Sequence, residues 1–275
     1  MNKYTGYCQE QILKPGSSIY YALLHLETNY KHEISALIAF MREIKKTTSN
    51  YKEISIAKTK IKWWQNEINN LYQHKPTHPI SFALETVLKK YTIPQQLLNE
   101  YLEGAILKLE TDHFCTEKDI VFFSYREYGL MLIALSYVLS PFPNHLTQCL
   151  HKFSETLTRI DFIQYAQQYS KNNKQIFSLE MLDKNKINHN TDISSKSLQP
   201  LFIEHANIAR QQYLSALKDL TKVQKNTLKP LLIFLKIKIK LLQEIENDGF
   251  NVYQYYYQLT PIRKYFIAKT QQFLL

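Results

Sequence analysis

The sequence predicts an all-α protein with a single domain over residues 1–275. Of its 275 residues, 45% are hydrophobic, whereas only 5 are Gly and 9 are Pro. This composition argues against a disordered, collagen-like or turn-rich β protein. Apolar residues also recur at helical spacing along most of the chain. The polar stretch 183–197 interrupts this pattern and is interpreted as a surface loop.

The first long helix is expected at 17–46, because apolar side chains recur there every three or four residues. The next, 51–73, has the same period and ends before Pro76, which cannot continue a helix. Proline near the first turn is typical of the start of a helix. The remaining segments with a helical period are 80–91, 94–110, 116–139, 142–169, 201–220, 228–246, 252–258 and 262–274.

The segment 228–242 admits more than one interpretation. Lys and Ile alternate at 236–240 as they would in a strand, but the long apolar context of 231–242 favours a helix. Its lysines beside an apolar face would suit attachment to a membrane surface. A core helix whose lysines reach solvent explains the same pattern, and we favour it.

The charge balance predicts an anionic partner. Lys and Arg number 34 against 24 Asp and Glu, which gives a net charge of +10. Nucleic acid, a phospholipid surface and a phosphorylated small molecule all suit such a charge. The basic residues are scattered and are not interleaved with aromatics as in nucleic-acid modules, so nucleic acid is not expected.

The cysteines and the hydropathy predict a cytoplasmic protein that is soluble or at most peripheral on a membrane. Cys8, Cys115 and Cys149 are odd in number and show no C-x-x-C spacing, which disfavours disulfides and a zinc site. The first ten residues lack the apolar core of a signal peptide. No uncharged apolar stretch reaches the roughly 18 residues that a transmembrane helix needs.

Common catalytic motifs are missing from the sequence. It contains neither G-x-G-x-x-G nor a Walker-type phosphate loop, and no H-E-x-x-H. Asp112, His113 and Glu127 are residue types that transfer protons in enzymes. We interpret each of them as a helix-end or hydrogen-bonded residue.

Several short segments form an ordered pattern along the chain. They are PGSSIYYAL at 15–23, ALIAFMREI at 36–44, KWWQNEI at 62–68 followed by His78-Pro79, Glu103-Gly104, and FSYR at 123–126 with Gly129. Together they resemble the squalene/phytoene synthase family, whose members join two prenyl diphosphates head to head. The resemblance implies an isoprenoid-synthase-like helical bundle around a central cavity, with Mg²⁺ holding the diphosphates.

The resemblance breaks at the aspartates that would hold this metal. In the family, the helix that carries F-x-R continues into D-D-x-x-D, where this sequence has Lys45, Lys46 and Ser49. At about 4 Å and an effective dielectric constant near 20, one unit charge beside a divalent ion is worth roughly 8 kcal/mol. This energy is attractive for Asp and repulsive for Lys.

The other acidic positions of the family have changed as well. The second aspartate motif aligns with Ala166 and Ser170, and the aspartate that follows the central Gly is Lys108. We therefore expect no bound Mg²⁺, no other cofactor and no catalytic residue of the family type. In this loss the chain is similar to a mitochondrial complex I assembly factor that resembles the same family, but the likeness does not identify a partner.

Two functions remain open at this point. The first is a non-catalytic relative that binds a prenyl diphosphate, an acidic lipid or a protein partner. The second is an active prenyltransferase that uses other acids, for which Glu43, Glu103, Glu110 and Asp112 are candidates. For the first, the resemblance and the charges assign substrate binding to Ser18, Arg42, Lys45, Lys46, Lys108, Phe123 and Tyr125.

Each of these residues also has a purely structural interpretation. Arg42 can pair with Glu43 or Glu67, and the three lysines can point into water. Phe123 and Tyr125 suit a core as well as a cavity wall.

Overall fold

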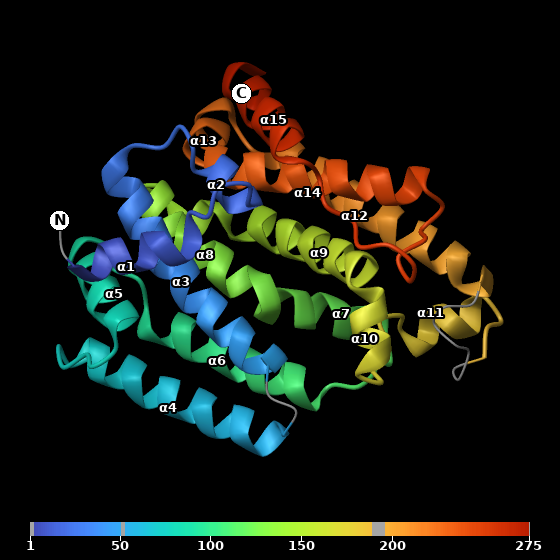
Figure 1. The fold of residues 1–275 in the computed structure, drawn as a ribbon, viewed down its shortest axis with the longest axis horizontal. Helices are drawn as coiled ribbons and strands as arrows, with labels where there is room; N and C mark the ends of the chain where they lie inside the picture. Colours follow the sequence, from blue (N-terminus) through green and yellow to red (C-terminus); the bar gives the residue numbers. More distant parts are fainter. Residues whose placement is uncertain (1–2, 51–52, 189–195, 275) are drawn as a thin grey trace.

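The computed structural model describes residues 3–50, 53–188 and 196–274, and within these ranges it is a helical bundle without strands (Figure 1). The all-α fold class is therefore confirmed. The α-helices are α1 (Lys3–Ile12), α2 (Ser18–Ala22), α3 (Thr28–Asn50), α4 (Ile54–Tyr72), α5 (Pro79–Lys90), α6 (Gln95–Glu110), α7 (Glu117–Ser124), α8 (Leu130–Leu139), α9 (Thr147–Gln164), α10 (Ala166–Lys171), α11 (Leu179–Lys184), α12 (Gln199–Asp219), α13 (Lys222–Thr227), α14 (Lys229–Asn247) and α15 (Pro261–Leu274). A π-helix at Tyr125–Gly129 joins α7 to α8, and short 3₁₀ turns lie at Pro143–Leu146 and Lys196–Leu198.

Most of the expected helices are present, with two differences in the first half. The segment 17–46 is divided, because α2 ends at Ala22 and α3 begins only at Thr28. The segment 116–139 is continuous but contains the π-helix. The short helices α1, α11 and α13 were not expected, and part of the predicted loop, 189–195, lies outside the described residues.

The prediction of a helix at 252–258 is wrong. Helix α14 ends at Asn247, and Gly249 and Phe250 then take positive φ angles of 68° and 59°. Two carbonyls of the following segment accept side-chain hydrogen bonds from a neighbouring part of the bundle: Gln167 Nε2 donates to Tyr253 O at 2.8 Å and Gln164 Nε2 to Tyr257 O at 3.1 Å. These tertiary bonds take the place of helical ones.

The helices form two groups: one packs around α3 and α6, and the other packs around α9. Helix α4 packs on α5 and α6, and α1 packs on α3 and α5. On the other side α12 and α14 pack on α9, and α15 packs on α14 and α2. Figure 1 shows α9 crossing the middle of the molecule, with α4 along one edge and α15 at the opposite edge.

Helix α14 is a core helix. Its apolar side chains from Leu231 to Ile245 are largely buried, and the helix contacts α2, α9 and α15. This packing accounts for the apolar face that also suited membrane attachment. No helix in the described ranges has both the length and the apolar character needed to cross a bilayer.

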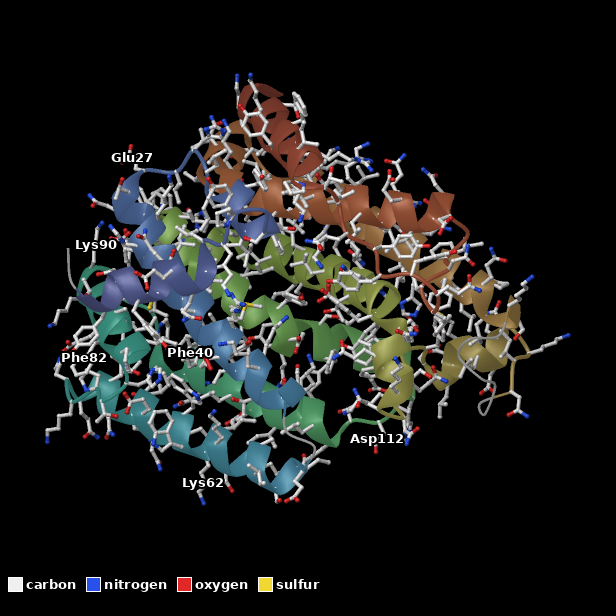
Figure 2. The ribbon with its side chains drawn as sticks, in the orientation of Figure 1. Glu27, Phe40, Lys62, Phe82, Lys90 and Asp112 are labelled. Atoms are coloured by element: carbon white, nitrogen blue, oxygen red, sulfur yellow. The ribbon has the colours of Figure 1, made fainter. Side chains whose placement is uncertain are left out.

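The two neighbouring tryptophans differ sharply in their surroundings. Trp64 is 1% exposed and its ring lies 5.5 Å from that of Phe40, whereas Trp63 is 44% exposed. Figure 2 shows Phe40 inside the bundle, while Lys62 and Asp112 lie towards its edge. Trp64 shares the buried stripe of α4 with Ile61, Ile68 and Leu71.

We expect Trp64→Ala to lower the free energy of unfolding by about 3 to 5 kcal/mol, because it removes a large buried ring and leaves a cavity. Urea denaturation followed by circular dichroism measures this change. Trp63→Ala is the matched control and should lower it by about 1 kcal/mol or less. Equal effects of the two substitutions would contradict the assignment of Trp64 to the core.

Candidate functional site: a buried ion network

The centre of the bundle holds a carboxylate between two lysines. Glu127 lies in the π-helix and its side chain is 11% exposed. Lys108 Nζ on α6 lies 2.8 Å from Glu127 Oε1, and Lys45 Nζ on α3 lies 3.0 Å from the same oxygen. One acidic side chain thus joins α3, α6 and the π-helix.

A glycine on α6 permits this arrangement. A Cβ at Gly104 would lie 2.8 Å from Arg126 Cβ and 3.2 Å from the Arg126 carbonyl oxygen, so any larger residue would push α6 away from the π-helix. Lys108 follows Gly104 by one helical turn and therefore faces the same neighbour. The close approach places its ammonium group beside Glu127.

A second buried ion pair continues the network towards α14. Lys238 Nζ lies 2.8 Å from Asp161 Oδ1 on α9 and 2.8 Å from Gln164 Oε1. The Tyr128 hydroxyl donates a short hydrogen bond to Asp161 Oδ2. Lys45 Nζ lies 3.7 Å from the centre of the Tyr128 ring, and this cation–π contact connects the two ion pairs.

The network shifts the pKa values of its members. Burial raises the pKa of the Glu127 carboxyl, but Lys108 and Lys45 outweigh it and hold that pKa below its usual value. Asp161 behaves in the same way, with Lys238 and Lys45 lowering its pKa against the effect of burial. Burial lowers the pKa of Lys45, whereas the attraction of Glu127 overcomes burial and raises that of Lys108.

Little space remains around this network. The side chains of Lys45, Lys108, Tyr101 and Glu127, with their neighbours, leave a cavity of about 10 Å³. That volume corresponds to about one water molecule. The resemblance implied a central cavity, and at Glu127 side chains fill it.

The residues assigned to substrate binding are only partly brought together. Lys45 and Lys108 meet at Glu127, but Lys46 pairs with Glu43 on its own helix at 3.1 Å. Arg42 donates a short hydrogen bond to the carbonyl oxygen of Gln11 on α1.

The two aromatic residues of the set lie in different surroundings. Phe123 is buried in an aromatic cluster with Phe114 and Phe162, at centroid distances of 5.2 and 5.9 Å. The Tyr125 ring lies 4.8 Å from that of His151.

Ser18 borders a separate cavity. This cavity has a volume of about 180 Å³ and lies between α2, α14, α15 and the segment 256–259. Lys238 and Lys264 both line it. Lys264 is 2% exposed, and its Nζ donates to Gly16 O at 2.8 Å. Burial, and then the repulsion of Lys238, lower the pKa of Lys264.

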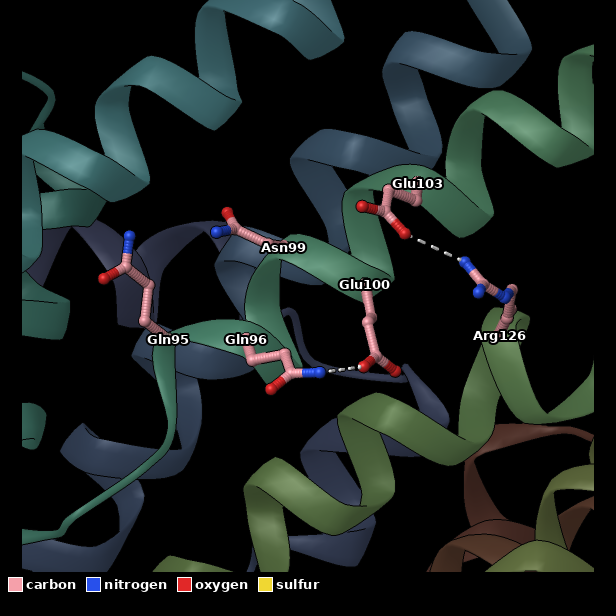
Figure 3. Close-up of a pocket in the computed structure, with 6 residues that line it drawn as sticks. All are labelled: Gln95, Gln96, Asn99, Glu100, Glu103 and Arg126. Carbon is pink, nitrogen blue, oxygen red and sulfur yellow. Dashed lines mark hydrogen bonds and ion pairs between the residues drawn. The ribbon is translucent and has the colours of Figure 1, made fainter.

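A larger but open pocket lies beside the π-helix on the surface of α6 (Figure 3). Its volume is about 560 Å³ and its lining is polar: Gln95, Gln96, Asn99, Glu100, Glu103 and Arg126. Both acids already have partners, because Arg126 lies 3.3 Å from Glu103 and Gln96 donates to Glu100 at 2.9 Å.

The residues at the positions where the resemblance places the family's aspartates do not fit a Mg²⁺ site. Magnesium requires about six oxygen ligands, and a lysine ammonium group offers no acceptor. The alternative acids also lie apart, since Glu110 pairs with Lys58, and Asp112 is 72% exposed and 3.9 Å from Lys174. Across residues 3–50, 53–188 and 196–274, no group of three or more His, Cys, Asp or Glu side chains is suited to hold a metal.

The family model of squalene/phytoene synthase matches residues 12–265. The chain belongs to the squalene/phytoene synthase family. None of the curated proteins matches its sequence. The predicted family is thus confirmed over nearly the whole chain.

Three solved structures share the fold at low sequence identity. A dehydrosqualene synthase in complex with ligand superposes with a TM-score of 0.88 at 16% identity, covering 98% of this chain and 95% of that one. Squalene synthase HpnC from Alicyclobacillus acidocaldarius gives 0.80 at 10% identity, covering 90% and 95%. YisP from Bacillus subtilis subsp. subtilis strain 168 gives 0.72 at 13% identity, covering 97% and 95%.

Sequence reasoning missed Asp161, Lys238 and Lys264 as site residues. The first two carried a signal, because each is a charged residue among buried apolar neighbours on its helix. Lys264 carried none. The large apolar side chains of Ile262 and Phe266 on α15 are exposed, so helical period alone places Lys264 on the wrong face.

We expect Glu127→Gln to lower the free energy of unfolding at neutral pH by about 3 kcal/mol, because it leaves two lysines near the centre without a counter-charge. Glu110→Gln breaks an exposed ion pair with Lys58 and should lower the free energy of unfolding by less than about 1 kcal/mol. Urea denaturation of both variants measures the difference. Similar small losses would show that Glu127 contributes no more than a surface ion pair.

The effect of Glu127→Gln should also depend on pH. The folded-state pKa of Glu127 lies below its unfolded value, so its ionised form stabilises the fold above about pH 4. This contribution is lost as the pH falls through the folded-state pKa. The stability difference between wild type and variant should therefore be constant near neutral pH and shrink in acid. A difference that grows in acid would show that the folded-state pKa of Glu127 lies above its unfolded value.

Proposed function

We propose that this chain is a non-catalytic member of the squalene/phytoene synthase family. The observation that supports this most directly is Glu127, which pairs with lysines at two positions where the resemblance places aspartates. Ionisation of an allylic diphosphate requires cationic groups that are free to stabilise the leaving group. Lys45 and Lys108 are engaged with Glu127, and the remaining space is too small for a prenyl chain.

We propose further that the protein binds the phosphate-bearing head group of an acidic lipid or prenyl diphosphate in the cavity of Lys264. This lysine is 2% exposed, and within the described residues it forms no ion pair with a carboxylate. A buried cation without a counter-ion is unfavourable, and a bound anion would relieve it. A volume of about 180 Å³ suits a head group, with the hydrocarbon chain remaining outside.

We expect the purified protein with Mg²⁺ and farnesyl diphosphate to release no pyrophosphate above a heat-killed control. Calorimetric titration of the same protein with a non-hydrolysable farnesyl diphosphate analogue should nevertheless detect binding. Because side chains supply the positive charge, binding should not change with EDTA but should weaken as salt is added.

Variants separate the parts of this proposal. Lys264→Met keeps the apolar stem and should abolish binding, whereas Lys62→Met on the exposed side of α4 should leave it unchanged. Metal-dependent release of pyrophosphate would overturn the non-catalytic assignment and favour an active prenyltransferase that uses other acids. Absence of binding, or equal binding by both variants, would remove the head-group site and favour a protein partner.

A further inference from the structure

Helix α15 presents its larger apolar side chains, Ile262, Tyr265 and Phe266, to solvent, whereas Ile267 and Ala268 pack against the core. Ile262, Tyr265, Phe266 and Lys269 follow the i, i+3, i+4, i+7 spacing of one helical face. The three apolar or aromatic members are 64%, 39% and 55% exposed, in that order. The opposite face, which packs on α14 and α2, contains Ala268 and the buried Lys264. The larger apolar side chains of this helix thus lie on its exposed face.

Two tyrosines of the segment before α15 are also exposed. Tyr255 and Tyr256 are 60% and 69% exposed. Tyr256 also lines the cavity of Lys264. We call Tyr255, Tyr256, Ile262, Tyr265 and Phe266 the C-terminal aromatic patch.

Most charges around the patch are positive or neutralised. Residues 249–274 contain Arg263, Lys264 and Lys269 but no Asp or Glu. Glu244 on α14 pairs with Arg263 at 2.6 Å, and Asp248, just after α14, accepts a hydrogen bond from the Tyr257 hydroxyl. Lys269 is exposed on the same face as Ile262 and Phe266. The partner of the patch should therefore combine an apolar layer with negative charge.

We propose that the C-terminal aromatic patch binds the surface of an anionic lipid bilayer. Aromatic side chains with a polar edge suit the boundary between head groups and acyl chains, and a flanking lysine adds attraction to anionic lipids. An exposed apolar cluster of this kind marks an interaction surface. A helix that lies in the plane of the membrane buries one such face without crossing the bilayer. This inference does not depend on the proposed function, because it concerns the outer face of α15 and not the cavity behind it.

Vesicle flotation tests the proposal with two matched double variants. Ile262→Ser/Phe266→Ser removes the centre of the patch. Ile54→Ser/Phe142→Ser removes one Ile and one Phe of similar exposure, 48% and 66%, from α4 and from the turn after α8. Wild type and the second variant should float with phosphatidylcholine vesicles that contain phosphatidylglycerol. The first variant should bind these vesicles at least about tenfold more weakly, as expected for two lost apolar side chains.

The charge of Lys269 and the depth of position 266 in the bilayer provide independent readouts. Lys269→Glu should weaken binding to anionic vesicles but leave any binding to pure phosphatidylcholine unchanged, and high salt should act similarly. In the Phe266→Trp variant, the fluorescence of the introduced indole should be quenched by brominated acyl chains. In the Phe142→Trp variant it should not be quenched. Failure of wild type to float, or equal losses in the two double variants, would overturn the proposal. A concentration-dependent dimer that Ile262→Ser/Phe266→Ser abolishes, without any flotation, would overturn it in favour of self-association.

Discussion

The interaction on which the centre of this fold depends is the carboxylate of Glu127 between Lys45 and Lys108. Without it, two ammonium groups would approach one another in a partly dehydrated interior, where repulsion is weakly screened. The close contact of α6 with the π-helix, which Gly104 permits, is what places the three charges together. Backbone geometry and charge thus support each other: the helices approach closely, and the carboxylate stabilises their approach.

This network changes what the family fold can do at its centre. A Mg²⁺ cluster requires several free oxygen ligands and room for a substrate, whereas the side chains here satisfy one another internally. Asp161 is paired with Lys238, and Tyr128 bonds to Asp161 and lies under Lys45, so the two ion pairs form one continuous set. A carboxylate that is already neutralised is a poor metal ligand. The proposed loss of catalysis follows from this saturation as well as from the identity of the residues at the aspartate positions.

Function is instead proposed on the two faces of α15. Its inner face places Lys264 beside a cavity of about 180 Å³, and its outer face exposes Ile262 and Phe266. Tyr256, in the segment before α15, lines this cavity and is also exposed to solvent. The head-group proposal concerns the cavity on the inner side of α15, and the membrane proposal concerns its outer face. The two proposals are therefore compatible, although each is tested separately.

The sequence by itself determined the all-α class, most helices and the family, because apolar period and ordered motifs are local properties. The resemblance also placed Lys45 and Lys108 at positions where the family has aspartates. The sequence did not predict which carboxylate those lysines meet, since Glu127 lies 82 residues after Lys45 and only packing brings them to 3.0 Å. Nor did it place Lys264 inside, because α15 has its apolar period on the exposed face. Tertiary structure decided these points: the close approach of α6 fixed the ion network, and the docking of α15 on α14 and α2 determined which side of that helix is buried.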